Sequence, residues 1–401
     1  MAHQLPSASG REDEDHARLR APSVPMRGAP SLGTVSVSVF TQPGPDTVRA
    51  WDRLVDDTPG SDVAQLSAWS QVRRPAGFLP LYLLAWHDDR LVGGALVLQR
   101  HAPMLGLVGY LPYGPVIAPW APRAATAHAL CAALADLGQQ HLGGLFVQPL
   151  DGASDVSDRL LGLGFRPSAA ETAPEASIRI DLTRDVEDLR GGLTRSNRRG
   201  TRNWAGRGIA VRIGSERDLP LLTDLMECTA EHQNFDPPSL DHVATLYQEL
   251  DRGGRAKVFI AELDGEPVVA ELFTLCGGVL KSRLSGMHRS GPARKSRVAA
   301  ALEWHALLWA KAHGYHTFDV GGLSVPAAQI VQAGGRDLAS RLAGPEFFKA
   351  SFGGRAFRYP APVELISSPF ARAGYGLACR YPAGGKLVAT MKRVMRSGAE
   401  Y

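Results

Sequence analysis

The sequence has no long uninterrupted hydrophobic run. Its longest apolar stretches, such as Phe78–Trp86, are much shorter than the roughly 18–20 residues that span a bilayer, so no transmembrane helix is expected. Residues 1–33 lack the apolar core of a signal peptide, and their Pro, Ser, Arg and acidic residues predict a disordered tail. We therefore expect a cytoplasmic protein that is not exported.

Cysteine is scarce, and its spacing suits neither metal binding nor disulfides. The four cysteines, Cys131, Cys228, Cys276 and Cys379, lie 97, 48 and 103 residues apart. Such distances match no zinc-ligand pattern and no disulfide framework. The twelve histidines show no HExxH-like spacing either. We expect reduced thiols and no metal site.

Acidic residues are missing from two stretches of the chain. The net charge of +4 is too small to indicate a nucleic-acid-binding protein by itself. However, residues 189–215 hold seven arginines and residues 272–302 hold six basic residues, with no Asp or Glu in either. Four arginines of the first stretch recur at helical spacing: Arg195, Arg198, Arg199 and Arg202. On one helix face they could follow the phosphate backbone of a nucleic acid, although a solvated surface is the alternative interpretation.

The chain contains one secondary-structure pattern that occurs twice. A hairpin pattern at Leu81–Arg100 recurs at Val258–Cys276, and a helix–glycine–strand pattern at 123–148 recurs at 298–320. This order is typical of a GNAT-type acyltransferase core. It predicts an α+β fold of tandem GNAT-like (acyl-CoA N-acyltransferase-like) domains, each a mixed β-sheet flanked by helices. The predicted limits are 34–175 for the first domain and 176–355 for the second.

Five segments between about residues 60 and 360 resemble the Fem-type peptidyl-bridge aminoacyltransferases, a family built from two GNAT-like halves. They are Gln65–Trp69 followed by Arg73, Tyr110–Val116, Leu193–Val211, Tyr315–Gly322 and Pro345–Gly354. In that family they match a Gln…Trp…Lys element, a Tyr-x-Pro-x-Gly-Pro-Val signature, a basic helix that opens the second domain, an Asp-x-Gly-Gly strand end and a Phe-Lys-x-x-Phe-Gly-Gly motif. The resemblance also implies that residues 356–401 pack back on the first domain.

Three positions depart from the family pattern, all where the acceptor would lie. Val243 stands four residues before Tyr247 where relatives that use a nucleotide-linked precursor carry Arg. Ala118 replaces an Asp, and Ser285 replaces an aromatic residue. The acceptor is therefore either a peptidoglycan precursor, as in the family, or a small amine of secondary metabolism.

The predicted catalytic residues are Lys349, Phe348 and Asp319. Lys349 follows two phenylalanines and precedes Phe352-Gly353-Gly354. A cation in such a partly dry site would stabilise the oxyanion formed in acyl transfer, and the resemblance assigns the family's catalytic lysine to Lys349. A lysine that snorkels past aromatic rings is the alternative. Asp319, which ends a strand before two glycines, could equally be structural.

The predicted acceptor site consists of Arg73, Tyr110, Tyr113 and Tyr247. Arg73 would share a helical face with Gln65 and Trp69 at i, i+4 and i+8, and could pair with a phosphate or carboxylate. Tyr110 and Tyr113 flank a proline-rich turn. Ordinary packing or surface roles are the alternatives for these side chains.

The predicted donor is aminoacyl-tRNA, with no cofactor. Acetyl-CoA enzymes of the GNAT type carry a glycine-rich loop whose amides bind the pyrophosphate, but the loop before helix 298–313 lacks the second glycine and contains Pro292. Arg294 and Lys295 could still bind phosphates through their side chains. No general base stands out, with Asp236 and Glu303 as spare candidates.

The leading hypothesis is thus an aminoacyl-tRNA-dependent N-aminoacyltransferase that forms an amide on an amine acceptor. One alternative is an acyl-CoA-dependent N-acyltransferase acting on a sugar or lipid amine. Another is a non-catalytic RNA- or carbohydrate-binding module on the same scaffold.

Overall fold

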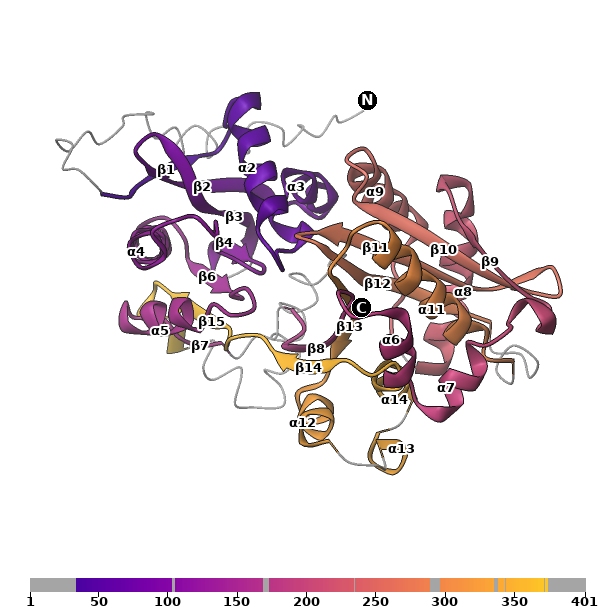
Figure 1. Cartoon of the computed structure of the whole chain (residues 1–401). Coiled ribbons are helices and arrows are strands. Elements are labelled where there is room, and N and C mark those ends of the chain that lie inside the picture. Colours follow the sequence, from indigo (N-terminus) through magenta and orange to yellow (C-terminus); the bar gives the residue numbers. More distant parts are fainter. Residues whose placement is uncertain are drawn as a thin grey trace, which may run out of the picture. The chain divides into compact units, whose positions relative to one another are not determined.

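Two β-sheets organise the chain in this computed structural model (Figure 1). The structure describes residues 34–102, 105–168, 173–233, 235–288, 296–334, 338–342, 344–370 and 372–373. The tail predicted at 1–33 lies outside these ranges, as do Arg294 and Lys295. None of the helices in the described ranges combines the length and apolar character needed to cross a lipid bilayer.

The first sheet has the strand order β1-β2-β3-β4-β6-β15-β7, with β5 paired to β3. Its strands are β1 (Ser36–Phe40), β2 (Leu79–His87), β3 (Arg90–Ala102), β4 (Gly106–Leu111), β5 (Val116–Ile117), β6 (Gly144–Val147), β7 (Arg166–Pro167) and β15 (Val363–Ile366). Strands β4 and β6 pair in parallel. The predicted hairpin turn falls at Asp88 and Asp89, which adopt φ values of 48° and 59°, as a tight turn between right-twisted strands requires.

The second sheet has the order β14-β8-β13-β12-β11-β10-β9. Its strands are β8 (Ala176–Asp181), β9 (Ile209–Ile213), β10 (Ala256–Leu263), β11 (Glu266–Cys276), β12 (Val279–Met287), β13 (Thr317–Leu323) and β14 (Arg355–Arg358). Read from β9, it repeats the first sheet: an antiparallel hairpin, β10–β11, is followed by a parallel pair, β12–β13. The prediction of two repeated α+β halves is therefore confirmed.

Helices occupy equivalent places in the two halves. They are α2 (Pro45–Asp57), α3 (Ser67–Arg73), α4 (Arg123–Gln140), α5 (Ser154–Gly162), α6 (Val186–Gly192), α7 (Arg195–Gly200), α8 (Leu219–Gln233), α9 (Leu240–Asp251), α11 (Val298–Ala312), α12 (Val325–Ala333), α13 (Leu338–Arg341) and α14 (Gly344–Ala350). A pair of helices follows β1 in the first sheet (α2–α3) and β9 in the second (α8–α9). A longer apolar helix, α4 or α11, precedes the parallel strand, as predicted from the glycine-terminated helical patterns.

Each sheet receives a strand from a distant part of the chain (Figure 1). Strand β8 follows β7 in sequence but pairs antiparallel with β13 in the second sheet, whereas β15, late in the chain, pairs antiparallel with β6 in the first. Both therefore lie beside the second strand of a parallel pair. The domain limits given above stay predictions. The chain crosses to the second sheet between β7 and β8 and returns to the first between β14 and β15.

The prediction of a single basic helix for the arginine-rich stretch is wrong. Helix α7 ends at Gly200, so Arg202 lies beyond it, and the chain then turns into β9. The breaks have local causes. Thr194 accepts a hydrogen bond from the Asn197 amide and starts a new helix, and Gly208, at φ 72°, ends the turn before β9.

Candidate functional site

A cavity opens where β12 and β13 separate. Their parallel pairing is limited to Val279–Lys281 with Thr317–Asp319, after which β13 continues only beside β8. On the other side of β12 the register with β11 shifts between Leu272 and Phe273, a β-bulge of the kind that re-aims side chains near functional sites. The resulting cavity measures about 960 Å³.

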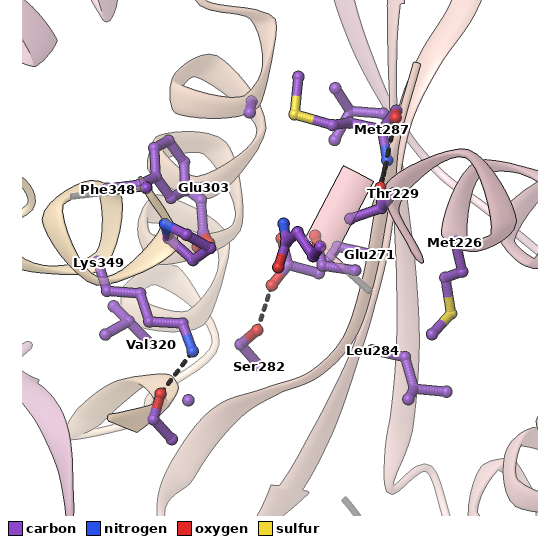
Figure 2. Close-up of a pocket in the computed structure, with 18 of the residues that line it drawn as sticks. Met226, Thr229, Glu271, Ser282, Leu284, Met287, Glu303, Val320, Phe348 and Lys349 are labelled. Carbon is purple, nitrogen blue, oxygen red and sulfur yellow. Dashed lines mark hydrogen bonds between the residues drawn. The ribbon is translucent and has the colours of Figure 1, made fainter. Parts of the chain in front are cut away.

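Four polar side chains from four elements meet in this cavity, among apolar walls (Figure 2). They are Glu271 of β11, Ser282 of β12, Glu303 of α11 and Lys349 of α14. The apolar lining includes Met226, Val269, Leu284, Met287 and Val320. A mostly apolar cavity with a few convergent polar groups is typical of a binding or catalytic site.

Lys349 lies in the last turn of α14 and reaches into the cavity (Figure 2). Its Nζ donates a hydrogen bond of 2.6 Å to the carbonyl oxygen of Gly322. Gly321, at φ 87°, passes so close that a Cβ there would stand 3.6 Å from Nζ. Burial lowers the pKa of Lys349, while the carboxyl groups of Glu271 and Glu303 act in the opposite direction.

Two buried carboxyl groups face each other beside this lysine (Figure 2). Glu271 lies in β11 between Val269 and Phe273, which pack on the same face in the core that α11 covers. Burial raises the pKa of Glu271 to about 7, against a hydrogen bond that Ser282 Oγ donates to its Oε1. Burial and then the charge of Glu271 raise the pKa of Glu303 well above its ordinary range. Burial and mutual repulsion therefore favour one proton shared between the two carboxyls.

The structure brings together only part of the predicted catalytic set. Lys349 and Phe348 both line the cavity, and the Phe348 ring packs edge-on against Phe352 with centroids 5.2 Å apart. Asp319 does not line it. Its carboxylate accepts hydrogen bonds from the Gly321 amide (3.0 Å), Ser177 Oγ and Arg179 Nε (3.2 Å). Asp319 thus positions the turn on which Lys349 rests, the structural alternative considered above.

The four predicted acceptor residues do not line this cavity. Arg73 is fully buried, with its guanidinium 4.6 Å from the centre of the Phe78 ring. Tyr110 and Tyr113 are buried in the first half, and Tyr247 is buried on α9. The Tyr113 ring lies 4.5 Å from Lys281 Nζ. Their assignment to an acceptor site stays a prediction.

The prediction that Gln65, Trp69 and Arg73 share one helical face is wrong. Gln65 belongs to a 3₁₀ turn that ends at Leu66, where the backbone is extended, and α3 begins only at Ser67. The Gln65 amide donates to the Pro112 carbonyl (2.6 Å) and accepts from the Leu96 amide (2.9 Å). It therefore holds the Tyr110–Val116 segment against the first sheet.

The arginines of α7 and the following turn divide into bonded and exposed groups. Arg198 donates to the carbonyls of Gly191 (2.9 Å) and Leu193 (3.0 Å). Arg195, Arg199 and Arg202 are exposed, and within the described ranges no acidic side chain pairs with them. Arg202 also lines a groove of about 530 Å³ together with Arg190, Trp204 and Trp304. Asn197 places α7 at the main cavity, since its side chain lines the wall.

Sequence reasoning missed Glu271 and gave Glu303 and Asp236 only minor weight, although all three line the cavity. A signal was present: Glu271 is the one charged residue in the run Val268–Cys276, and Glu303 interrupts the apolar run Val298–Leu308. An acidic residue inside a strand or helix core is buried by its neighbours, and buried carboxyls are retained where chemistry needs them.

Comparisons with known proteins agree with this architecture. A family model described as an acetyltransferase (GNAT) domain matches residues 188–339. A solved structure titled "Crystal structure of FemX" superposes with a TM-score of 0.69 at 16% identity, covering 84% of this chain and 99% of that one. The structure of L-PGS from Bacillus licheniformis gives a TM-score of 0.51 at 11% identity, covering 84% and 96%. The predicted GNAT-like fold is thus confirmed.

Curated relatives carry the name lipid II:glycine glycyltransferase. The protein from Staphylococcus saprophyticus is 23% identical over 237 residues, which cover 56% of this chain and 57% of that protein. The protein of that name from Staphylococcus aureus (strain MRSA252) is 22% identical over 237 residues, covering 56% of each. The chain spans about half the length of the curated relatives it matches.

Proposed function

We propose that this chain is an N-acyltransferase which transfers an aminoacyl group to an amine. The premise is that the chain is a homologue of the Fem-type aminoacyltransferases in the GNAT superfamily. The acceptor that the relatives' name favours is a lipid II-type cell-wall precursor. The proposed donor is aminoacyl-tRNA. A small amine of secondary metabolism is the second acceptor class to test, because Val243, Ala118 and Ser285 depart from the family pattern.

The observation that carries the proposal is the placement of Lys349 in the cavity at the opening between β12 and β13. The ester of an aminoacyl-tRNA is already activated, so the protein must mainly orient the two substrates and stabilise charge. The acceptor nitrogen attacks the ester carbonyl and forms a tetrahedral oxyanion. The Lys349 ammonium stabilises this oxyanion. Collapse then expels the ribose oxygen, which takes up the proton lost by the amine, and leaves an amide.

The surface beside the cavity supports a polyanionic donor. Helix α7 contributes Asn197 to the cavity wall and carries Arg195 and Arg199 on its exposed side. Arg202 and Trp204 follow in the adjacent groove. Exposed arginines without acidic partners bind phosphates, and an aromatic ring offers a stacking surface for a base. A tRNA acceptor arm on this surface would deliver its 3′ end to Lys349.

The test is transfer of radiolabel from a pool of charged tRNAs to nucleotide-linked and lipid-linked muropeptide precursors and to a cell extract's small amines. Reactions run with and without ribonuclease, with Lys349→Ala beside the wild type. Lys257→Ala, a substitution on β10 outside the cavity lining, is the matched control. We expect ribonuclease-sensitive transfer that Lys349→Ala abolishes and Lys257→Ala retains.

Three results would overturn parts of the proposal. Transfer from labelled acyl-CoA that is indifferent to ribonuclease would make the protein an acyl-CoA-dependent enzyme. Transfer that Lys349→Ala leaves unchanged would remove the lysine from the chemistry. An absence of transfer from both donors would favour a binding module on an acyltransferase scaffold.

A further inference from the structure

We infer that Glu271 and Glu303 form a receptor for the α-ammonium group of the aminoacyl donor, so that the cavity selects an aminoacyl group over an uncharged acyl group. This role presupposes the aminoacyl transfer proposed above and specifies which part of the donor is recognised. It makes the two carboxyls specificity-determining residues, distinct from the oxyanion-stabilising Lys349.

The first support is the arrangement of the two carboxyl groups. Glu271 and Glu303 come from β11 and α11, are 3% and 4% exposed, and point into the same part of the cavity (Figure 2). Ser282 Oγ donates to Glu271 Oε1 and so orients that carboxyl. Glu303 Oε2 is buried and accepts no hydrogen bond from the described residues. A buried acceptor is costly unless a donor is supplied. Here the neighbouring Glu271 carboxyl can bond to Glu303 only through a shared proton, so a cationic ligand is the alternative donor.

The second support is the charge balance of the cavity. When both glutamates are ionised, Lys349 offsets only one of the two negative charges. Within the described ranges Lys349 forms no ion pair with either carboxyl and donates instead to the Gly322 carbonyl. The other cations in the lining are engaged elsewhere, since Arg283 donates to Asp62 (3.1 Å) and Arg297 to Asn197 (3.4 Å). The two carboxyls are therefore suited to one further cationic group.

The shape of an aminoacyl ester fits the two sets of groups. Its α-nitrogen is separated from the carbonyl carbon by a single carbon atom. A donor whose carbonyl oxygen meets the Lys349 ammonium thus presents its α-ammonium to the neighbouring carboxyls. An acetyl group, or an α-hydroxyacyl group, would satisfy Lys349 equally well but would leave Glu271 and Glu303 with no cation.

The same arrangement predicts proton release on binding. Before the donor binds, burial favours the protonated form of the pair, because two buried carboxyls cannot both ionise beside one lysine. An arriving ammonium replaces the shared proton as the balancing charge. The other charged residues of the lining are Lys349, the exposed Asp236, and Arg283 and Arg297. Arg283 is bonded to Asp62 and Arg297 to Asn197.

The test compares donors with and without the α-ammonium group. A pool of tRNAs charged with ¹⁴C-labelled amino acids is used as such or after treatment with nitrous acid, which replaces the α-ammonium with a hydroxyl. We expect the wild type to prefer the aminoacyl pool by about 100-fold or more in kcat/KM, since a site built for a polar group rejects an analogue that lacks it. Glu303→Gln and Glu271→Gln should lose most of this preference. Glu266→Gln, which removes an exposed carboxylate at the start of the same strand, β11, and outside the cavity lining, should keep it.

A binding measurement covers the case in which a variant folds poorly or the acceptor is wrong. The probes are non-hydrolysable 3′-aminoacylamino-3′-deoxyadenosines and their desamino counterparts, titrated into the wild type by calorimetry in two buffers of different ionisation enthalpy near pH 7. We expect the amino probes to bind more tightly and to release a proton, and the desamino probes to release none.

The outcomes separate this inference from the proposed function. Wild-type enzyme that uses both donor pools equally, or an unchanged preference in Glu303→Gln, overturns the ammonium receptor while aminoacyl transfer stands. If no donor is transferred at all, the proposed function fails, and calorimetry alone decides: tighter binding of the amino probes with proton release upholds the receptor, and equal or absent binding overturns it.

Discussion

Lys281 of the second half donates a hydrogen bond of 2.9 Å from Nζ to Asp62 Oδ2 of the first half. Arg283 adds a second bond, 3.1 Å long, to Asp62 Oδ1. All three side chains are buried. Burial acts to raise the pKa of Asp62, but the charges of Lys281 and Arg283 outweigh it and hold that pKa well below its usual range. One carboxylate thus joins β12, which borders the cavity, to the first half.

Removing this carboxylate should destabilise the protein strongly. Asp62→Ala removes the carboxylate that two buried cations share, and breaking a buried ion pair typically costs about 3–5 kcal/mol. Urea unfolding should therefore shift to a lower midpoint. Asp151→Ala is the matched control, because Asp151 is an exposed partner of Arg179 and its loss should cost about 1 kcal/mol or less. An equal loss of unfolding free energy in the two variants would show that the buried ion pairs of Asp62 contribute no more to stability than an exposed ion pair.

The same carboxylate predicts acid sensitivity. Because the folded pKa of Asp62 is depressed, its stabilisation is complete above the pKa of the unfolded chain and is lost as the pH falls through the folded value. The free energy of unfolding of the wild type should therefore decline below about pH 4 more steeply than that of Asp62→Asn. Parallel curves for the two proteins would contradict the assignment.

Glu271 should have the opposite effect on the pH dependence of stability. Its folded pKa is raised to about 7, so the folded state binds more protons than the unfolded state between roughly pH 4 and pH 7, and stability falls as the pH rises through that range. Glu271→Gln removes this loss, which amounts to at most about 3 kcal/mol. Chemical denaturation at pH 5 and pH 8 measures it. A stability difference that stays constant between the two pH values would be inconsistent with a buried ionisable pair.

Gly321→Ala should lower kcat, whereas its melting temperature should fall no further than that of a control glycine substitution. The residue has φ 87°, and an added Cβ would stand 3.3 Å from the Ser282 carbonyl oxygen and 3.6 Å from Lys349 Nζ. Strain of this kind costs about 1–2 kcal/mol. Gly77→Ala is the control, because Gly77 is also left-handed, with φ 80°, but faces open space. We expect similar melting temperatures for both variants and a lower kcat only in Gly321→Ala; equal kcat values would argue against crowding of Lys349.

The exposed arginines should account for the salt dependence of tRNA binding. Replacing Arg195, Arg199 and Arg202 together with alanine should weaken binding and lower the slope of log affinity against log salt by about one for each phosphate that is no longer neutralised. Filter binding at several salt concentrations measures this slope. Arg217→Ala, at another exposed site, should leave it unchanged. An unaltered slope in the triple variant would make this surface an ordinary solvated one.

Local patterns in the sequence were sufficient to predict the repeated elements. The Asp88-Asp89 and Asp264-Gly265 turns separate apolar runs, and glycine ends the two long helical patterns, so hairpins and helices follow from nearest neighbours. The arginine-rich stretch was mispredicted for a local reason as well. Its spacing suits one helix, but Thr194 and Gly208 start and stop shorter elements within it.

The sequence by itself therefore determined the two halves, the hairpin–helix–strand order within each, and the motif that carries Lys349. Only the tertiary structure decided which strand completes each sheet, because β8 and β15 take corresponding places in different sheets and their pairing depends on contacts far apart in the chain. It also decided that Glu271, Glu303 and Lys349 meet in one cavity while Arg73 and Asp319 are buried outside it. Periodicity tells which face of an element is apolar. It does not tell which three elements bring their few buried charges together, and that convergence sets the pKa values and the chemistry of the site.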